Sequence, residues 1–280
     1  MLTRHLALVA ETKSITAADL NKVAAALQKQ VTRDFGPIWE IQATISAFSK
    51  LEDVPSDYWP ILIEDHIKTK GGSGVHEDKN GQPFALVQFS SEWSLTSSHE
   101  TLEMLADPFG NRLVAGKSPK PGQGRVNFLV EVCDPSEAKP FAYTVNGITV
   151  ADFYTPHFFD PVTSAAVRYS YTGAVKKPRT IRKGGYLSWG VPETNEWFQQ
   201  IWFNTPRPTF RSLGVLGAKR TGSLRAMIDR LTPTPLENEL VAEKAAAPVV
   251  ASAIYEEADS AAAARAKTLR RQITAIKGKG

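Results

Sequence analysis

The stretch from residue 94 to residue 134 gathers the side chains of this sequence that could bind a metal ion. His99 and Glu103 are four residues apart, so on a helix they lie on the same face, and Asp107 follows one turn later. Glu131 and Asp134 add two carboxylates a short distance downstream. Imidazole and carboxylate groups suit zinc or another divalent cation. This stretch therefore predicts a metal site built on one helix and a later acidic segment.

The spacing of these residues is similar to that of a known group of metalloproteins. The pattern His-Glu-x-x-Glu-x-x-x-Asp-Pro at 99–108, followed by Glu-x-x-Asp at 131–134 and Val-Asn-Gly-Ile-Thr-Val at 145–150, resembles a zincin-like pattern of uncharacterised bacterial and phage-associated proteins. It is also similar to the pattern of EXORDIUM-type phosphate-induced plant proteins. The resemblance covers residues 36–160, and Glu103 stands where the familiar zincin motif has a second histidine.

The resemblance implies a role for each candidate residue. Glu100 would be the general base that takes a proton from a water acidified by the ion, and Glu131 is the first choice for the third ligand after His99 and Glu103. Asp107 and Asp134 would orient His99 or fix the end of the helix, although each also precedes a proline and can be read as a turn residue.

His157 is a further catalytic candidate. It lies in an aromatic run, Tyr154 to Asp160, and could donate a hydrogen bond to a substrate oxyanion. A histidine in such a run is more often a structural, partly buried residue, so both interpretations stay open. His66 and His76 have no partner at a ligand spacing, and we interpret both as structural or surface residues.

The surrounding sequence predicts an α+β fold, with a zincin-like mixed sheet and an active-site helix. Apolar residues recur at helical spacing over 16–34, and Ser94 to Asp107 reads as a helix that stops at Pro108. Alternating patterns and turn residues predict strands and hairpins. The expected strands are 39–48, 58–67, 84–89 and 126–133, with hairpins at Asn80-Gly81 and Asn146-Gly147.

Composition limits the classes of protein to which the chain can belong. No apolar run is long enough to cross a bilayer, and the opening residues are too short an apolar run for a secretory signal. Cys133 is the single cysteine, which excludes an internal disulfide and a cysteine-rich metal site. We therefore expect a cytoplasmic protein, or one associated with a virion or phage-like particle.

The carboxy-terminal part differs in composition from the rest of the chain. We divide the chain into a zincin-like core domain at 1–205 and an arm at 206–280, in which 206–250 reads as a linker and 253–276 as a helix. The net charge of +4 is concentrated in this arm. Without a nucleic-acid-binding motif we interpret the basic residues as a solvated surface, so a nucleic-acid partner is not expected.

Two functions follow from these observations. The first is a metal-dependent hydrolase of peptidase type, with Zn²⁺ or another divalent cation and a peptide or protein substrate. The alternative is a structural or assembly protein that retains a degenerate zincin scaffold. Its contacts would come from the arm and from an aromatic segment, Trp189, Trp197, Phe198, Trp202 and Phe203, for which core packing is the competing interpretation.

Overall fold

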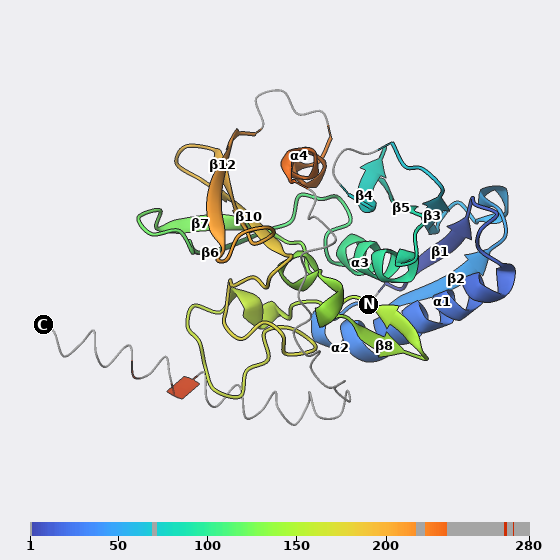
Figure 1. The fold of residues 1–280 in the computed structure, drawn as a ribbon, viewed down its shortest axis with the longest axis horizontal. Helices are drawn as coiled ribbons and strands as arrows, with labels where there is room; N and C mark the ends of the chain where they lie inside the picture. The colour runs from blue at the N-terminus through green and yellow to red at the C-terminus, as the bar shows by residue number, and fades with distance from the viewer. Residues whose placement is uncertain (1, 69–71, 217–221, 234–265, 268–270, 272–280) are drawn as a thin grey trace, which may run out of the picture.

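Two five-stranded sheets lie on either side of a central helix (Figure 1). The computed structural model describes residues 2–68, 72–216 and 222–233, together with 266, 267 and 271. Helices and sheets are both abundant, which confirms the predicted α+β class. Among the described residues, no helix is long and apolar enough to cross a membrane.

The first sheet is mixed. Its order is β2-β1-β3-β5-β4, and β4 at one edge is its one antiparallel strand. The sequence over β1 is apolar at consecutive positions, and Leu6 to Val9 are fully buried. The strands are β1 (Arg4–Ala10), β2 (Ala43–Phe48), β3 (Trp59–Glu64), β4 (Gly74–Lys79) and β5 (Gln82–Gln88).

Local turn chemistry fixes the edge of this sheet. Asn80 and Gly81 join β4 to β5 with φ angles of 55° and 81°, a left-handed pair that asparagine and glycine tolerate best. The hairpin expected at Asn80-Gly81 is therefore confirmed. It sets the register in which His76 lies opposite Ala85, and this register positions one of the site residues described below.

Helices α1 (Ala17–Lys29) and α3 (Trp93–Ala106) pack on the same sheet and contact each other. Thr16 caps α1 by accepting a hydrogen bond from the backbone N–H of Asp19, as its capping pattern predicts. A π-helical turn, Gln30–Phe35, continues α1 into the short α2 (Gly36–Trp39). The strand expected over 39–48 therefore begins only at Ala43, whereas α3 matches the helix expected over 94–107.

The second sheet is antiparallel throughout, with the order β12-β11-β10-β7-β6. The aromatic segment lies here: Trp189 is fully buried, and Trp197, Phe198 and Phe203 are at most 7% exposed, so they pack in the core. The strands are β6 (Leu113–Lys117), β7 (Arg125–Leu129), β10 (Tyr186–Val191), β11 (Glu196–Ile201) and β12 (Thr209–Val215). A separate hairpin joins β8 (Tyr143–Val145) to β9 (Ile148–Val150) through Asn146-Gly147, as predicted.

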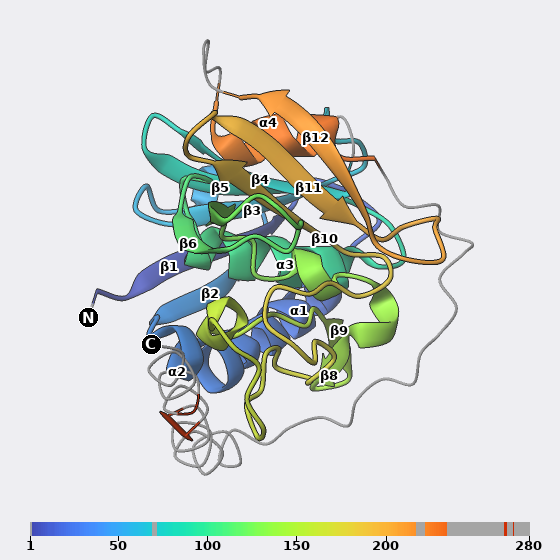
Figure 2. The ribbon, with the colours of Figure 1, turned by 90° about the vertical axis from the view of Figure 1, so that its left-hand side faces the viewer.

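The segment expected to be a linker contains ordered elements. β12 pairs with β11, and helix α4 (Leu224–Leu231) packs with Leu129 and Trp197 of the second sheet. Both views place α4 between β4 and the second sheet (Figures 1 and 2). Composition suggested a linker because this segment is rich in Pro, Arg, Thr and Ser, but its apolar residues are spaced to bury one face of α4. The helix expected over 253–276 falls almost entirely outside the described residues.

Candidate metal centre

A cluster of buried and partly buried charged side chains lies where α3, α4, β4 and the segment after β7 meet. It contains six carboxylates, two imidazoles and one guanidinium, and we call it the acidic centre. Its members are Glu100, Glu103, Glu131, Asp134, Glu137, Asp229, His76, His99 and Arg225.

Three of the predicted metal-site residues converge at one point of the acidic centre. His99 Nε2 lies 3.2 Å from Glu103 Oε2 and 3.3 Å from Asp134 Oδ1. A tetrahedral zinc with bonds of about 2.0–2.2 Å sets neighbouring donor atoms about 3.3–3.6 Å apart. Asp134 Oδ1 is buried and makes no hydrogen bond. The two distances from His99 and the unpaired Asp134 oxygen both suit a divalent ion.

Helix geometry and one backbone hydrogen bond fix these side chains. His99 and Glu103 are one turn apart on α3, and Glu103 is fully buried. The other oxygen of Glu103, Oε1, accepts a hydrogen bond of 3.1 Å from the backbone N–H of Cys133. Asp134 follows directly in a 3-10 turn, Asp134–Ser136. The chain after β7 thus supplies Asp134 to the centre and orients Glu103 through a backbone N–H.

Glu131 belongs to the same cluster and is linked to it by Arg225. Arg225 Nη1 donates to Glu103 Oε2 at 2.5 Å and also to Glu131 Oε2, and it lies 3.6 Å from Asp134 Oδ2. Oxygens of Glu103, Glu131 and Asp134 all lie within 4.8 Å of one another. The second oxygen of Glu131 is buried without a hydrogen bond. Glu131 is therefore placed to bind a cation, although Arg225 now lies beside it.

Contacts of the amino-terminal end of α4 position Arg225 in the acidic centre. Ser223 caps α4, and the backbone N–H groups of Leu224 and Arg225 donate to Asn111 Oδ1 and to the Gly110 carbonyl. A Cβ on Gly110 would lie 2.8 Å from Arg225 Cβ, so only glycine allows this approach. Asp229 then accepts a hydrogen bond of 2.7 Å from Arg225 Nε one turn further along.

The protonation behaviour of the acidic centre reflects its excess of acids. Burial raises the pKa of Glu131 well above its ordinary value, with Glu103 and Asp134 adding to the shift and Arg225 opposing it. Burial also raises the pKa of Asp229, to about 6. Burial would raise the pKa of Glu103 as well, but Arg225 and His99 outweigh it and hold that pKa well below its usual range.

His99 shows the opposite balance. Burial would lower the pKa of its imidazole, but Glu103 and Asp134 outweigh burial and raise the pKa well above its ordinary value. The acids therefore favour a cation at this position, which a proton on His99 or a metal ion can supply.

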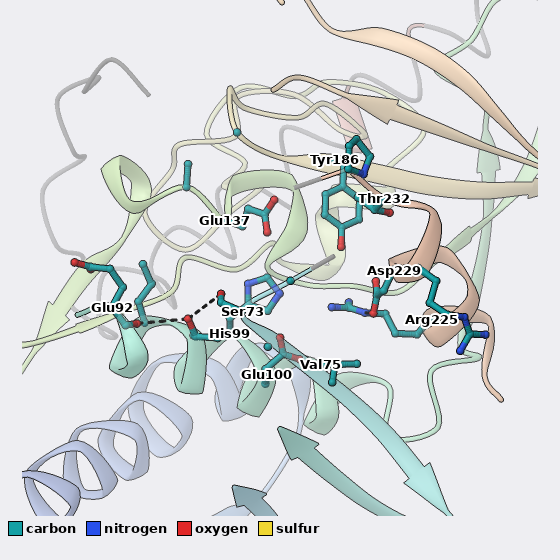
Figure 3. Close-up of a pocket in the computed structure, with 18 of the residues that line it drawn as sticks. Ser73, Val75, Glu92, His99, Glu100, Glu137, Tyr186, Arg225, Asp229 and Thr232 are labelled. Atoms are coloured by element: carbon teal, nitrogen blue, oxygen red, sulfur yellow. Dashed lines mark hydrogen bonds and ion pairs between the residues drawn. The ribbon is translucent and has the colours of Figure 1, made fainter. Parts of the chain in front are cut away.

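A pocket of about 570 Å³ opens onto the acidic centre. Figure 3 shows His99 and Glu100 of α3, Arg225 and Asp229 of α4, and Tyr186 of β10 along its wall. Three elements distant in sequence thus supply polar groups to one cavity. The arrangement can hold a ligand against His99 and Glu100.

Asp107 and His157 have other surroundings. The Asp107 carboxylate accepts a hydrogen bond of 2.6 Å from the backbone N–H of Arg112 and so fixes the end of α3, one of the two roles considered for it. His157 is paired with Asp160 at 3.2 Å, its side chain is 34% exposed, and it is not among the residues that line the pocket. We therefore assign neither side chain to the centre.

Sequence reasoning missed His76, Arg225, Asp229, Glu137 and Tyr186. His76 has no metal-binding residue at a recognisable spacing in the sequence, because it lies on β4 and reaches α3 only through tertiary structure. Arg225 and Asp229 did carry a signal, since an i, i+4 pair shares one face of a helix. That signal was hidden by the composition that suggested a linker.

Several ligand atoms of the acidic centre have no hydrogen-bond partner within it, and a divalent cation could pair with them. Glu100, Glu131 and Asp134 each bury an oxygen without a hydrogen bond, and native proteins leave few such atoms without a partner. Imidazole nitrogen and carboxylate oxygen are ligands of zinc and of similar ions. No protein-family model, curated protein or solved structure matches this chain.

Proposed function

We propose that the chain is a metal-dependent hydrolase on a zincin-like scaffold, acting on a peptide or related amide bond. His99, Glu103 and Asp134 would hold a zinc or similar divalent ion, with Glu131 beside them. The observation that carries the proposal is the position of His99 Nε2, which lies 3.2 Å from Glu103 Oε2 and 3.3 Å from Asp134 Oδ1. In this proposal Asp134 takes the ligand position for which Glu131 was the first choice.

The chain's own residues divide the remaining work. When bound, a divalent ion acidifies water and polarises a carbonyl oxygen. Glu100 lines the pocket next to His99 and is 3% exposed, so it can accept a proton at a site largely shielded from solvent. The backbone N–H of Cys133 orients Glu103. Asp107 fixes the end of α3, the helix that carries His99, Glu100 and Glu103.

Arg225 has two roles in this proposal. In the absence of an ion it neutralises Glu103 and Glu131, which would otherwise repel each other in a buried site. It also lines the pocket, so its guanidinium can receive a carbonyl or carboxylate oxygen of a substrate. Both roles require α4 to stay docked.

The test compares Glu100→Gln with the unmodified protein after loading with Zn²⁺, using a mixed library of quenched fluorescent peptides. The amide keeps the shape of the side chain but cannot take a proton, so hydrolysis should fall by about 10²- to 10⁴-fold. In Glu100→Gln, the ion held by His99, Glu103 and Asp134 should remain bound. Glu193→Gln, at an exposed position that does not line the pocket, is the control and should retain activity.

No hydrolysis in either form, with the tail needed for assembly, would instead support the structural alternative. In that case the peptidase proposal is wrong even if the ion binds. The cytoplasmic or particle-associated setting stays a prediction.

A further inference from the structure

A second group of ligand atoms lies on the β4 side of α3. His76 Nδ1 is 3.5 Å from Glu100 Oε2 and 3.9 Å from Glu103 Oε2. His76 and Glu103 are fully buried, and Glu100 is 3% exposed. His76 Nδ1 and Glu100 Oε2 have no hydrogen-bond partner. Two orphaned polar atoms thus face each other inside the protein.

The other nitrogen of His76 decides which atom of the ring faces the acids. His76 Nε2 lies 3.1 Å from the backbone carbonyl of Asp107. A carbonyl oxygen only accepts, so Nε2 carries the proton, and in a neutral imidazole Nδ1 presents its lone pair. A lone pair that faces two carboxylates is repelled unless a cation lies between them.

A metal ion fits this gap better than a proton does. Hydrogen bonds between nitrogen and oxygen span about 2.7–3.2 Å, shorter than either distance here. Donor atoms across a tetrahedral ion are about 3.3–3.6 Å apart, given bonds of about 2.0–2.2 Å. The 3.5 Å between His76 Nδ1 and Glu100 Oε2 lies in this range, and the 3.9 Å to Glu103 Oε2 lies slightly beyond it. Metal-binding histidines also commonly donate the second ring N–H to a backbone carbonyl, as His76 can to Asp107.

The charge of the acidic centre supports a second ion independently. Six carboxylates surround one guanidinium. When metal binding removes the protons of these acids, a single divalent ion would leave an excess of negative charge, and two ions would come close to balancing it. Buried charges need such compensation because removing a charge from water is unfavourable.

We propose that His76 Nδ1, Glu100 Oε2 and Glu103 bind a second divalent cation, so that Glu103 is shared between two ions. The proposal rests on the proposed function through Glu103 and Glu100, and Glu100 would then accept a proton through its other oxygen, Oε1. Ions that share ligands in two-metal sites lie about 3.5–4 Å apart. Glu100 Oε1 would remain beside Gly74 at the pocket, since a Cβ on Gly74 would lie 2.5 Å from that oxygen.

The test measures zinc per chain by elemental analysis after chelation, reloading with Zn²⁺ and removal of excess metal. The unmodified protein should hold two ions, His76→Gln one, and the exposed His66→Gln control two. Glutamine can keep the donor to the Asp107 carbonyl while it removes the Nδ1 ligand, and circular dichroism checks the fold. Loaded with Mn²⁺, the unmodified protein should show a spin-coupled pair, and His76→Gln the signal of an isolated ion.

Three other results would overturn one or both proposals. One ion in the unmodified protein, lost in His99→Ala and kept in His76→Gln, overturns the second site and leaves the hydrolase proposal standing. No ion in the unmodified protein overturns both. Two ions that persist in a folded His76→Gln variant would also contradict this assignment.

Discussion

Helix α3 separates two buried polar clusters that differ in how well their atoms are paired. On one side, Ser98 donates to Gln30 Oε1 at 2.7 Å and accepts from the Ala151 backbone N–H, and Gln30 donates to Tyr143 and to the Ala151 carbonyl. Tyr143 donates in turn to Asp34. We call this the Ser98 network. On the other side lies the acidic centre, with four buried atoms that have no hydrogen bond: His76 Nδ1, Glu100 Oε2, Glu131 Oε1 and Asp134 Oδ1.

The difference teaches how a structural cluster can be distinguished from a ligand site. Buried polar groups that satisfy one another stabilise a unique packing, whereas leaving a group unpaired costs about 1–3 kcal/mol. None of the side-chain atoms that form the Ser98 network is among the orphaned atoms of the described chain. The acidic centre keeps its unpaired atoms close together, which is expected where an absent ligand completes the pairing.

The largest expected effect comes from removing the guanidinium of Arg225 from the acidic centre. Arg225→Met should destabilise the metal-free protein by about 3–5 kcal/mol, because the buried carboxylates lose their partner. Zn²⁺ should recover part of this loss. Urea unfolding measures both effects.

The matched control is an exposed pair. Lys139→Met removes a partner of Glu92 at the surface and should cost less than about 1 kcal/mol. Equal losses in the two variants would show that Arg225 does not compensate a buried charge.

Two neighbouring serines of α3 offer a sharper comparison on the paired side. Ser98→Ala should cost about 1–3 kcal/mol, because Gln30 Oε1 and the Ala151 N–H lose their partner. Ser97→Ala should be nearly neutral, because the equally buried Ser97 hydroxyl makes no hydrogen bond within the described chain. Neither change should alter metal binding. A change in zinc content in Ser98→Ala would mean that the two clusters are not independent.

A smaller effect should appear in the pH dependence of the metal-free protein. Asp229 has a pKa of about 6 in the folded protein and an ordinary value of 3.8. Between these two pH values the folded state binds more protons than the unfolded state, so stability falls as the pH rises. The raised pKa of His99 acts in the same direction, because its stabilisation is lost as pH rises through the folded value. The lowered pKa of Glu103 acts the other way, but its stabilisation is complete above the ordinary value of 4.5.

Thermal melts in chelator should therefore show a midpoint that falls by a few degrees between about pH 5 and about pH 8. The stabilisation by Zn²⁺ should grow over the same range, because its ligands must lose their protons. A metal-free midpoint that rises over this range would contradict the charge balance assigned to the acidic centre.

Local signals made α3 and the two Asn-Gly hairpins predictable. Helical spacing and Pro108 fixed α3 almost to the residue, and left-handed turn positions fixed the hairpins. Strand β1 was missed because it is buried at consecutive positions and shows no alternation. The strand expected over 126–133 ends at Leu129, because the following residues leave the sheet to pass beneath α3.

The candidate site was predictable only where its residues lie on one helix or come soon after it. His99, Glu100, Glu103, Glu131 and Asp134 were identified from sequence and do gather in the acidic centre. His76 reaches it through the pairing of β4 with β5, and Arg225 through the docking of α4 on Gly110 and Asn111. Such long-range contacts leave no local pattern in a single sequence.

An anomalous diffraction map at the zinc edge, from crystals grown with Zn²⁺, tests the metal centre most directly. We predict a peak about 2.0–2.2 Å from His99 Nε2, Glu103 and Asp134, with Arg225 moved away from the Glu103 oxygen it now contacts. Absence of a peak there, with Arg225 still bonded to Glu103 and Glu131, would contradict the account.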